Sequence, residues 1–207
     1  YSKLNCAPLP GRVLREWVHP GEEFKPVPCK ACMRLVSPLL SFKYFSREDP
    51  LFLFTPPKAH LEALLKLYGH HYLEPTVALY VHVGPMDGKG RRKFLEWDYY
   101  KRALRLFPPE MKVLLFSDDP KLAESRFATL RENLIVIDET PANCVILMSR
   151  ADHQIISNSP LSWWGAYLNT KRDKIVVAPR SWNRGDFVDY LDDLLPKGWV
   201  QISVNDE

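Results

Sequence analysis

The residues best suited to chemistry are three small polar side chains, Ser157, Asn158 and Ser159, which stand between a short apolar run and an apolar helix. Ser159 suits the N-cap of that helix, and Pro160 suits its first position, where a missing N–H costs nothing. Such a turn directs backbone N–H groups and polar side chains out of the helix N-terminus, an arrangement that binds anions, phosphates above all. An ordinary capped strand-to-helix junction has the same pattern, so both interpretations stay open.

Other polar residues follow the other predicted strands. They are His82, Asp87 and Lys89 after the first strand, Ser117, Asp118 and Asp119 after the second, Asp138 and Glu139 after the third, and Arg180 after a later one. In an open α/β sheet, ligands bind outside the carboxyl ends of the strands. We therefore expect these groups to converge on one crevice.

Several of these residues also have a structural interpretation. His82 ends an apolar strand, where a histidine is commonly a core or edge residue. Asp118 and Asp119 precede Pro120 and suit helix initiation, although one of them could hold a nucleoside base or ribose. Asp87 lies in a Gly-rich segment, where aspartate is a good turn former.

The elements that would position these residues predict an α/β fold. Apolar β-rich runs alternate with segments of helical spacing, which indicates a parallel sheet covered by helices on both faces. The predicted strands are 77–83, 112–116, 134–137, 154–157, 174–178 and about 200–202, and the predicted helices are about 94–106, 120–130, 142–150, 163–168 and 187–195.

The first third of the chain has a different character. We expect a short, mostly helical region at residues 1–75 before a sheet domain at residues 76–207. Residues 1–28 are rich in proline and charge and predict an extended loop. The spacing of apolar residues predicts helices over about 32–40 and 57–72.

Composition excludes several classes of protein. The chain has 207 residues, of which 46% are hydrophobic and 26% charged, as in globular domains, and a net charge of +3 does not require a nucleic-acid partner. No apolar run is long enough for a transmembrane helix, and the N-terminus does not resemble a signal peptide. We expect a cytoplasmic protein, or one of the Golgi lumen if an N-terminal anchor was removed.

The four cysteines do not form a recognisable metal or redox motif. Cys29 and Cys32 have the C-x-x-C spacing of half a zinc site or of a redox pair, but no second C-x-x-C or H-x-x-x-H follows. We expect these two residues, together with Cys6 and Cys144, to be free thiols.

Four blocks of the sequence resemble the α-1,2-fucosyltransferases and their GDP-fucose-dependent relatives. Residues 157–168 read S-N-S-P-L-S-W-W-G-A-Y-L and resemble the family's N-S-x-F-S-W-W-G-A-x-L. Residues 116–119 read F-S-D-D, residues 99–103 read Y-Y-K-R-A, and residues 177–182 read V-A-P-R-S-W, close to the family's F-S-D-D, Y-Y-x-x-A and A-P-x-x-W. The blocks occur in the family's order.

The resemblance implies a Rossmann-like donor domain of a GT-B-type glycosyltransferase. It implies metal-independent, inverting transfer of L-fucose from GDP-fucose to a hydroxyl group of a glycan acceptor, with no cofactor besides the nucleotide sugar. It assigns Ser157, Asn158 and Ser159 to the phosphates. It also makes Asp118 or Asp119, after Ser117, a guanine or ribose contact, and places His82 near the base or the pyrophosphate.

The sequence departs from the family in its donor motif. The family reads H-V-R-R-G-D where residues 82–87 read H-V-G-P-M-D, so Gly84 and Pro85 replace two arginines. An arginine there would neutralise the departing diphosphate. The candidates to supply that charge from elsewhere are Lys89, Arg91, Arg92, Arg180 and Arg184.

The catalytic base has one leading candidate. Inverting transfer needs a group that accepts the proton of the acceptor hydroxyl, and Asp87 lies in the loop that faces the expected donor site. Asp138 and Glu139 are the alternatives. Because of the missing arginines, a non-catalytic homologue that binds a nucleotide or glycan is the alternative function, and a transferase that uses another nucleotide sugar is a further one.

Overall fold

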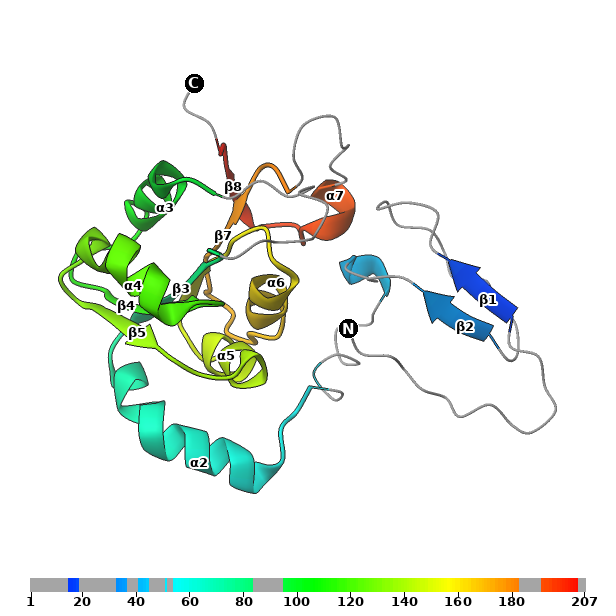
Figure 1. Cartoon of the computed structure of the whole chain (residues 1–207), viewed down its shortest axis with the longest axis horizontal. Helices are drawn as coiled ribbons and strands as arrows, with labels where there is room; N and C mark the ends of the chain where they lie inside the picture. Colours follow the sequence, from blue (N-terminus) through cyan, green and yellow to red (C-terminus); the bar gives the residue numbers. More distant parts are fainter. Residues whose placement is uncertain are drawn as a thin grey trace.

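A parallel six-stranded sheet forms the centre of the part of the chain that the computed structural model describes (Figure 1), namely residues 15–18, 33–36, 41–44, 51, 54–83, 95–182 and 191–204. Its strands are β3 (Thr76–Val81), β4 (Lys112–Ser117), β5 (Leu134–Ile137), β6 (His153–Ile155), β7 (Val176–Pro179) and β8 (Val200–Ile202). All six residues of β3 are buried, as expected for a strand that is covered on both faces.

The order of the strands is that of a Rossmann-like sheet. Across the sheet the strands follow the order β5-β4-β3-β6-β7-β8. The chain thus moves outward from β3 to β5 and then returns to place β6 on the other side of β3, which is the doubly wound arrangement. The predicted fold class is confirmed, and the point where the order reverses lies between β3 and β6.

Helices cover both faces of the sheet (Figure 1). Apolar side chains from α3 (Trp97–Leu104) and α4 (Pro120–Phe127) share one buried cluster with Val77, Leu79 and Val81 of β3. Residues of α2 (Lys58–Tyr68) and α5 (Pro141–Met148) pack in a second cluster with the alternate β3 residues Ala78 and Tyr80. Helix α6 (Pro160–Tyr167) packs on β7 through Trp163 and Ala166.

Shorter elements complete the described chain. They are the 3₁₀ helices η1 (Phe42–Tyr44), η2 (Gly69–Leu73) and η3 (Ala128–Leu130), the one-turn helix α7 (Leu191–Leu194) and a parallel pair of strands, β1 (Arg15–Val18) and β2 (Met33–Val36). The predicted helices 57–72 and 120–130 therefore each divide into an α-helix and a 3₁₀ turn.

The helix predicted over residues 32–40 is wrong. The backbone of Met33–Val36 is a strand that pairs in parallel with Arg15–Val18. This partner strand lies within residues 1–28, which were predicted as an extended loop. A short apolar run is compatible with the spacing of a helix and with that of a strand. Here the pairing with a segment distant in the sequence decides for the strand. Cys6, Cys29 and Cys32 lie outside the described residues, whereas Cys144 is a buried free thiol whose pKa is raised to about 12 by burial and by the nearby Glu139 carboxylate.

Helices α5 and α6 approach closely at Gly165. A Cβ atom at this position would lie 2.3 Å from the Met148 Cε and 2.9 Å from the Met148 Cβ. No real side chain tolerates such distances without a shift of its neighbours. The glycine of the W-W-G-A block therefore has a packing role, because it lets α6 lie directly on α5.

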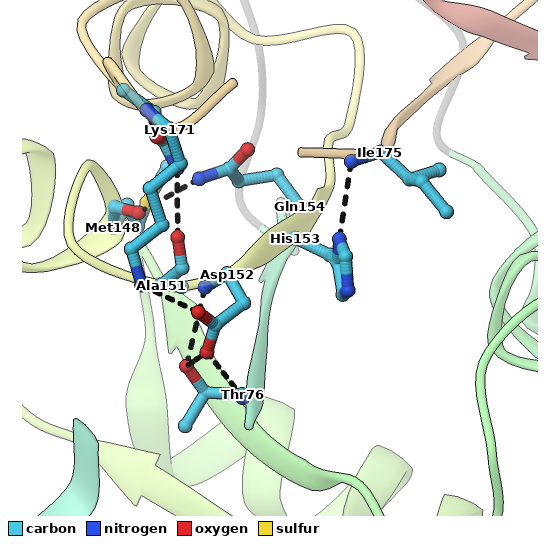
Figure 2. A network of polar contacts seen from close by, with 9 residues as sticks. Thr76, Met148, Ala151, Asp152, His153, Gln154, Lys171 and Ile175 are labelled. Carbon is cyan, nitrogen blue, oxygen red and sulfur yellow. Dashed lines mark hydrogen bonds and ion pairs between the residues drawn. The ribbon is translucent and has the colours of Figure 1, made fainter. Parts of the chain in front are cut away.

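Polar contacts connect the first residues of β3 and β6 at the amino edge of the sheet (Figure 2). The Asp152 Oδ2 accepts hydrogen bonds from the Thr76 N–H at 2.8 Å and from the Thr76 hydroxyl at 3.2 Å, while the Lys171 Nζ lies 2.5 Å from the Asp152 Oδ1. Partial burial raises the pKa of Asp152, but the Lys171 ammonium and the Thr76 donors outweigh it and hold this pKa below its usual range.

Candidate functional site

The predicted site residues that the structure describes lie at the carboxyl edge of the sheet. His82 follows β3, Ser117 ends β4, Ser157 follows β6 and Arg180 follows β7. Because these strands are parallel, their ends meet at one edge, and His82 and Ser157 flank the point where the strand order reverses. This is the place in a doubly wound sheet where ligands bind.

Ser157 carries a buried hydroxyl that lacks a partner in the part of the chain that the structure describes. The residue is fully buried, and among the described residues its Oγ has no hydrogen-bond partner. Burying a hydroxyl without a partner is unfavourable, and such groups in native proteins usually have a specific cause. A ligand atom that completes the hydrogen bonding of Ser157 is a direct explanation at this position in the fold.

The neighbouring side chains help to build the turn. Asn158 donates from Nδ2 to the backbone carbonyl of Trp182 at 2.9 Å, which ties the turn after β6 to the segment after β7. Ser159 occupies the predicted N-cap position, but its side chain makes no capping hydrogen bond and instead contacts the Tyr80 hydroxyl. Burial, with Asp118 nearby, raises the pKa of Tyr80, and the hydrogen bond with Ser159 partly opposes that shift.

Backbone N–H groups at the start of α6 face the same edge. Pro160 is the first helical residue, as predicted, and the first helical hydrogen bond runs from the Trp163 N–H to the Ser159 carbonyl at 3.0 Å. The N–H groups of Leu161 and Ser162 precede this bond at the positive end of the helix dipole. Together with Ser157, they form a group of donors suited to an anion.

Two hydroxyl groups that the residue-by-residue sequence analysis missed hold this turn. The Ser162 hydroxyl donates to the carbonyls of Ser157 at 3.0 Å and of Ser159 at 2.9 Å. The buried Tyr99 hydroxyl donates to the carbonyl of Ile156 at 2.7 Å. Ser162 lies in the S-W-W-G-A block and Tyr99 in the Y-Y-x-x-A block. The family resemblance of these blocks is the sequence feature that could have identified both residues.

The two aspartates after β4 have different roles. Asp119 is the N-cap of α4, and its Oδ1 accepts a hydrogen bond from the Leu122 N–H at 3.0 Å. Asp118 instead reaches across to the end of β3, where its Oδ1 accepts from the Val83 N–H at 2.8 Å and its Oδ2 lies 3.2 Å from the His82 Nδ1. The register explains this contact, since the last residues of β3 and β4 pair as Val81 with Ser117.

The Ser117 hydroxyl belongs to the same group. It accepts a hydrogen bond from the Asp119 N–H at 3.1 Å and lies 3.3 Å from the Asp118 Oδ1. Ser117 thus supports the turn between β4 and α4. Of this group, the His82–Asp118 pair lies nearest to the reversal point of the sheet.

The alternative bases after β5 differ from each other. The Glu139 carboxylate accepts hydrogen bonds from the Asn143 Nδ2 at 2.8 Å and from the Tyr68 hydroxyl at 3.1 Å. The hydrogen bond from Asn143, followed by those from the Thr140 N–H and Tyr68, lowers the pKa of Glu139. A carboxylate held in this way is a weaker proton acceptor, and Glu139 joins α2 to the start of α5. Asp138 is exposed.

The remaining predicted residues divide between exposed and undescribed positions. The Arg180 side chain is exposed, while its backbone N–H donates to the Ile202 carbonyl of β8 at 2.8 Å. Asp87 and Lys89 lie outside the described residues, as do Arg91, Arg92 and Arg184. Within the described part of the chain, no cluster of three or more His, Cys, Asp or Glu side chains is arranged to hold a metal ion.

Comparison with known proteins decides the family. The model of glycosyl transferase family 11 matches residues 80–203, which is more than half of the chain and spans the whole carboxyl edge described above. The chain belongs to glycosyl transferase family 11. The resemblance predicted from the four sequence blocks is therefore confirmed, and the chain is a member of a family of glycosyltransferases.

Two similar proteins of Escherichia coli match this chain over only part of their length. The chain is 44% identical over 99 residues to an O-antigen biosynthesis glycosyltransferase, WbnK, in a match that covers 44% of this chain and 32% of the relative. It is 31% identical over 111 residues to an α-1,2-colitosyltransferase, covering 50% of this chain and 38% of the relative. The matches thus span about a third of each relative.

Among solved structures, the chain is similar to the NodZ α-1,6-fucosyltransferase soaked with GDP-fucose. It shares 13% identity and a TM-score of 0.45 with this chain, over 70% of this chain and 54% of the other.

Within the described part of this family 11 member, no helix has the length and apolar character needed to cross a membrane.

Proposed function

We propose that this chain binds the nucleotide-sugar donor of a glycosyltransferase that transfers L-fucose from GDP-fucose to a hydroxyl group of a glycan, with inversion and without a metal ion. Family membership supports glycosyl transfer. The family resemblance of the sequence blocks supports GDP-fucose. One relative is named as an α-1,2-colitosyltransferase, so a transferase that uses another nucleotide sugar is the nearest alternative.

The buried Ser157 hydroxyl is the observation that supports donor binding most directly. It lies at the reversal point of the sheet, beside the first N–H groups of α6, and has no partner among the described residues. A diphosphate has several acceptor oxygens, which can bind neighbouring N–H and O–H donors at the same time. The helix dipole also favours its negative charge. We assign Ser157 and the N–H groups of Leu161 and Ser162 to the donor phosphates.

The proposed reaction is a single displacement. The acceptor hydroxyl oxygen bonds to the anomeric carbon of the sugar while the bond from that carbon to the diphosphate oxygen breaks, and the nucleoside diphosphate departs with the bonding electrons. Asp87 is our candidate to accept the hydroxyl proton. The N–H groups at the start of α6 stabilise the charge on the leaving phosphate, as preorganised donors do.

The His82–Asp118 pair has a supporting role in this proposal. Asp118 accepts the Val83 N–H at 2.8 Å and so fixes the point where the chain leaves β3. We assign His82 to the nucleoside side of the donor, next to the phosphates. Because Asp119 already caps α4, Asp118 and His82 are the better candidates for contacts that depend on the donor.

A non-catalytic binding protein is the second candidate, since Gly84 and Pro85 stand where the resembling family has arginines. Titration calorimetry with GDP-fucose, GDP and UDP-sugars, followed by assays of donor hydrolysis and of transfer, separates the two. We expect binding of GDP-fucose and GDP but not of UDP-sugars, together with transfer or slow hydrolysis that the Asp87→Asn variant loses. Binding without turnover supports the second candidate. Absence of binding to all nucleotides contradicts both.

A further inference from the structure

Ser162 makes two hydrogen bonds from one hydroxyl group. Its Oγ lies 3.0 Å from the carbonyl oxygen of Ser157 and 2.9 Å from that of Ser159. The residue is fully buried in the first turn of α6. A single O–H group is thus shared between the two carbonyls that flank Asn158.

This contact decides which backbone groups of the turn face a ligand. A carbonyl oxygen that points toward an anion repels it, whereas an N–H group attracts it. With the carbonyls of Ser157 and Ser159 held by Ser162, the turn has a fixed orientation before any ligand arrives. Preorganisation of this kind strengthens binding, because the ligand does not have to order the loop itself.

Other contacts hold the same turn from outside the helix. Tyr99 of α3 donates to the carbonyl of Ile156, directly before Ser157, and Asn158 donates to the carbonyl of Trp182. Ser162 is the contact from inside α6. Every one of these bonds orients the backbone around Ser157 and leaves the Ser157 hydroxyl itself without a partner among the described residues.

Two other helices contain serines that serve as a comparison. Ser125 in α4 donates to the Leu122 carbonyl at 2.8 Å, and Ser149 after α5 donates to the Ile146 carbonyl at 2.7 Å. Among the described residues, each bonds the carbonyl three residues earlier and no other, as serines in helices commonly do. Ser162 makes this local bond and also reaches beyond the helix to Ser157.

We propose that Ser162 is a positioning residue, which orients the turn at 157–159 for the diphosphate of a nucleoside diphosphate. The inference rests on the proposed function, because it concerns the same site. Ser162 acts through its hydroxyl oxygen on the backbone of Ser157 and Ser159. Its loss should weaken recognition of the phosphates and leave recognition of the nucleoside unchanged.

The test compares the affinities for GDP and guanosine in four proteins: the wild type and the Ser162→Ala, Ser162→Cys and Ser125→Ala variants. The cysteine keeps the approximate side-chain volume but is a weak donor, so it separates loss of the hydrogen bonds from loss of packing. We expect both Ser162 variants to bind GDP roughly five- to tenfold more weakly, which corresponds to the loss of about one hydrogen bond. Guanosine affinity should stay unchanged, and Ser125→Ala should bind both ligands like the wild type.

Three outcomes contradict the proposal in distinguishable ways. If the Ser162 variants keep the full preference of the wild type for GDP over guanosine, Ser162 does not position the turn. If they lose affinity for both ligands equally, its role is general stabilisation of the fold. If the wild type itself does not prefer GDP to guanosine, the proposed function fails, and the inference fails with it.

Discussion

At the amino edge of the sheet the Asp152 carboxylate accepts two hydrogen bonds from Thr76 and pairs with Lys171 (Figure 2). At the carboxyl edge, by contrast, the Ser157 hydroxyl is buried without a partner among the described residues. The same pair of strands, β3 and β6, connects the two edges. At the amino end of this pair the Asp152 carboxylate is satisfied from within the protein, and at the carboxyl end the Ser157 hydroxyl has no partner among the described residues.

The difference indicates which edge serves stability and which serves a ligand. A fully paired polar group stabilises the fold and has little left to offer a ligand. A buried, unpaired donor lowers stability and becomes satisfied when a ligand binds. Substitutions at the amino edge should therefore change the free energy of unfolding, whereas substitutions at the carboxyl edge should chiefly change binding.

The largest loss of stability is expected for Asp152→Ala. The buried N–H of Thr76 loses its acceptor and Lys171 loses its partner, so we expect the free energy of unfolding to fall by about 2–3 kcal/mol. Urea denaturation measures it, with Asp173→Ala, an exposed aspartate in the nearby turn, as the control that stays near wild type. If GDP affinity of the folded Asp152→Ala protein fell as well, the two edges would not be independent.

The next effect in size is expected for Gly165→Ala, which tests how rigidly α6 carries the site. The new Cβ would overlap with Met148, and overpacking of this kind costs about 1–3 kcal/mol. Gly69→Ala is the matched control, because the nearest atom to its Cβ is 3.8 Å away and the backbone is helical there. We expect that variant to be neutral or slightly stabilised in thermal unfolding. Equal destabilisation of both variants would contradict the packing explanation.

Tyr99→Phe should have a smaller effect. It removes the hydroxyl that donates to the Ile156 carbonyl at 2.7 Å and keeps the buried ring in place. We expect a loss of about 1 kcal/mol in the free energy of unfolding and a weaker affinity for GDP, because the carbonyl next to Ser157 is released. Calorimetry and urea denaturation of the same sample measure both. An unchanged GDP affinity would mean that α3 does not support the turn.

The smallest expected effect is a change in pH dependence at the amino edge. The His153 Nδ1 accepts a hydrogen bond from the Ile175 N–H, and burial, with Lys171 nearby, lowers the pKa of His153 although Asp152 opposes the shift. The unfolded chain therefore binds the proton more readily, and stability should fall as the pH drops below about 6.5, the ordinary value for histidine. His153→Asn keeps an acceptor but does not titrate, so its unfolding free energy should fall less between pH 7.5 and pH 5.5. An identical slope in both proteins would contradict this assignment.

The regular part of the fold was predictable from local patterns. The strands at 134–137 and 200–202 match β5 and β8. Residues 134–137 are a short apolar run, residues 200–202 alternate apolar and polar side chains, and turn residues stand beside both. The error at Met33–Val36 has the opposite cause: that strand depends on a partner at Arg15–Val18, and the charged residues of the partner conceal it.

The candidate site was predictable in its location but not in its contacts. The N-cap role of Asp119 follows from local sequence, because the acceptor and donor are three residues apart. The contact of Asp118 with His82 depends on the pairing of β3 with β4, which the sequence does not specify. In the same way, Ser159 contacts Tyr80 from a neighbouring strand, whereas Ser157 has no such neighbour among the described residues.

The central claim is that the Ser157 hydroxyl binds a ligand and does not stabilise the fold. The Ser157→Ala variant tests this claim most directly. Its free energy of unfolding and its affinity for GDP should be measured together, with Ser159→Ala as the comparison that removes a hydroxyl in contact with Tyr80. We predict that Ser157→Ala is as stable as the wild type, or more stable by up to about 1 kcal/mol, and binds GDP at least about fivefold more weakly. A destabilised Ser157→Ala protein that binds GDP as tightly as the wild type would contradict the claim.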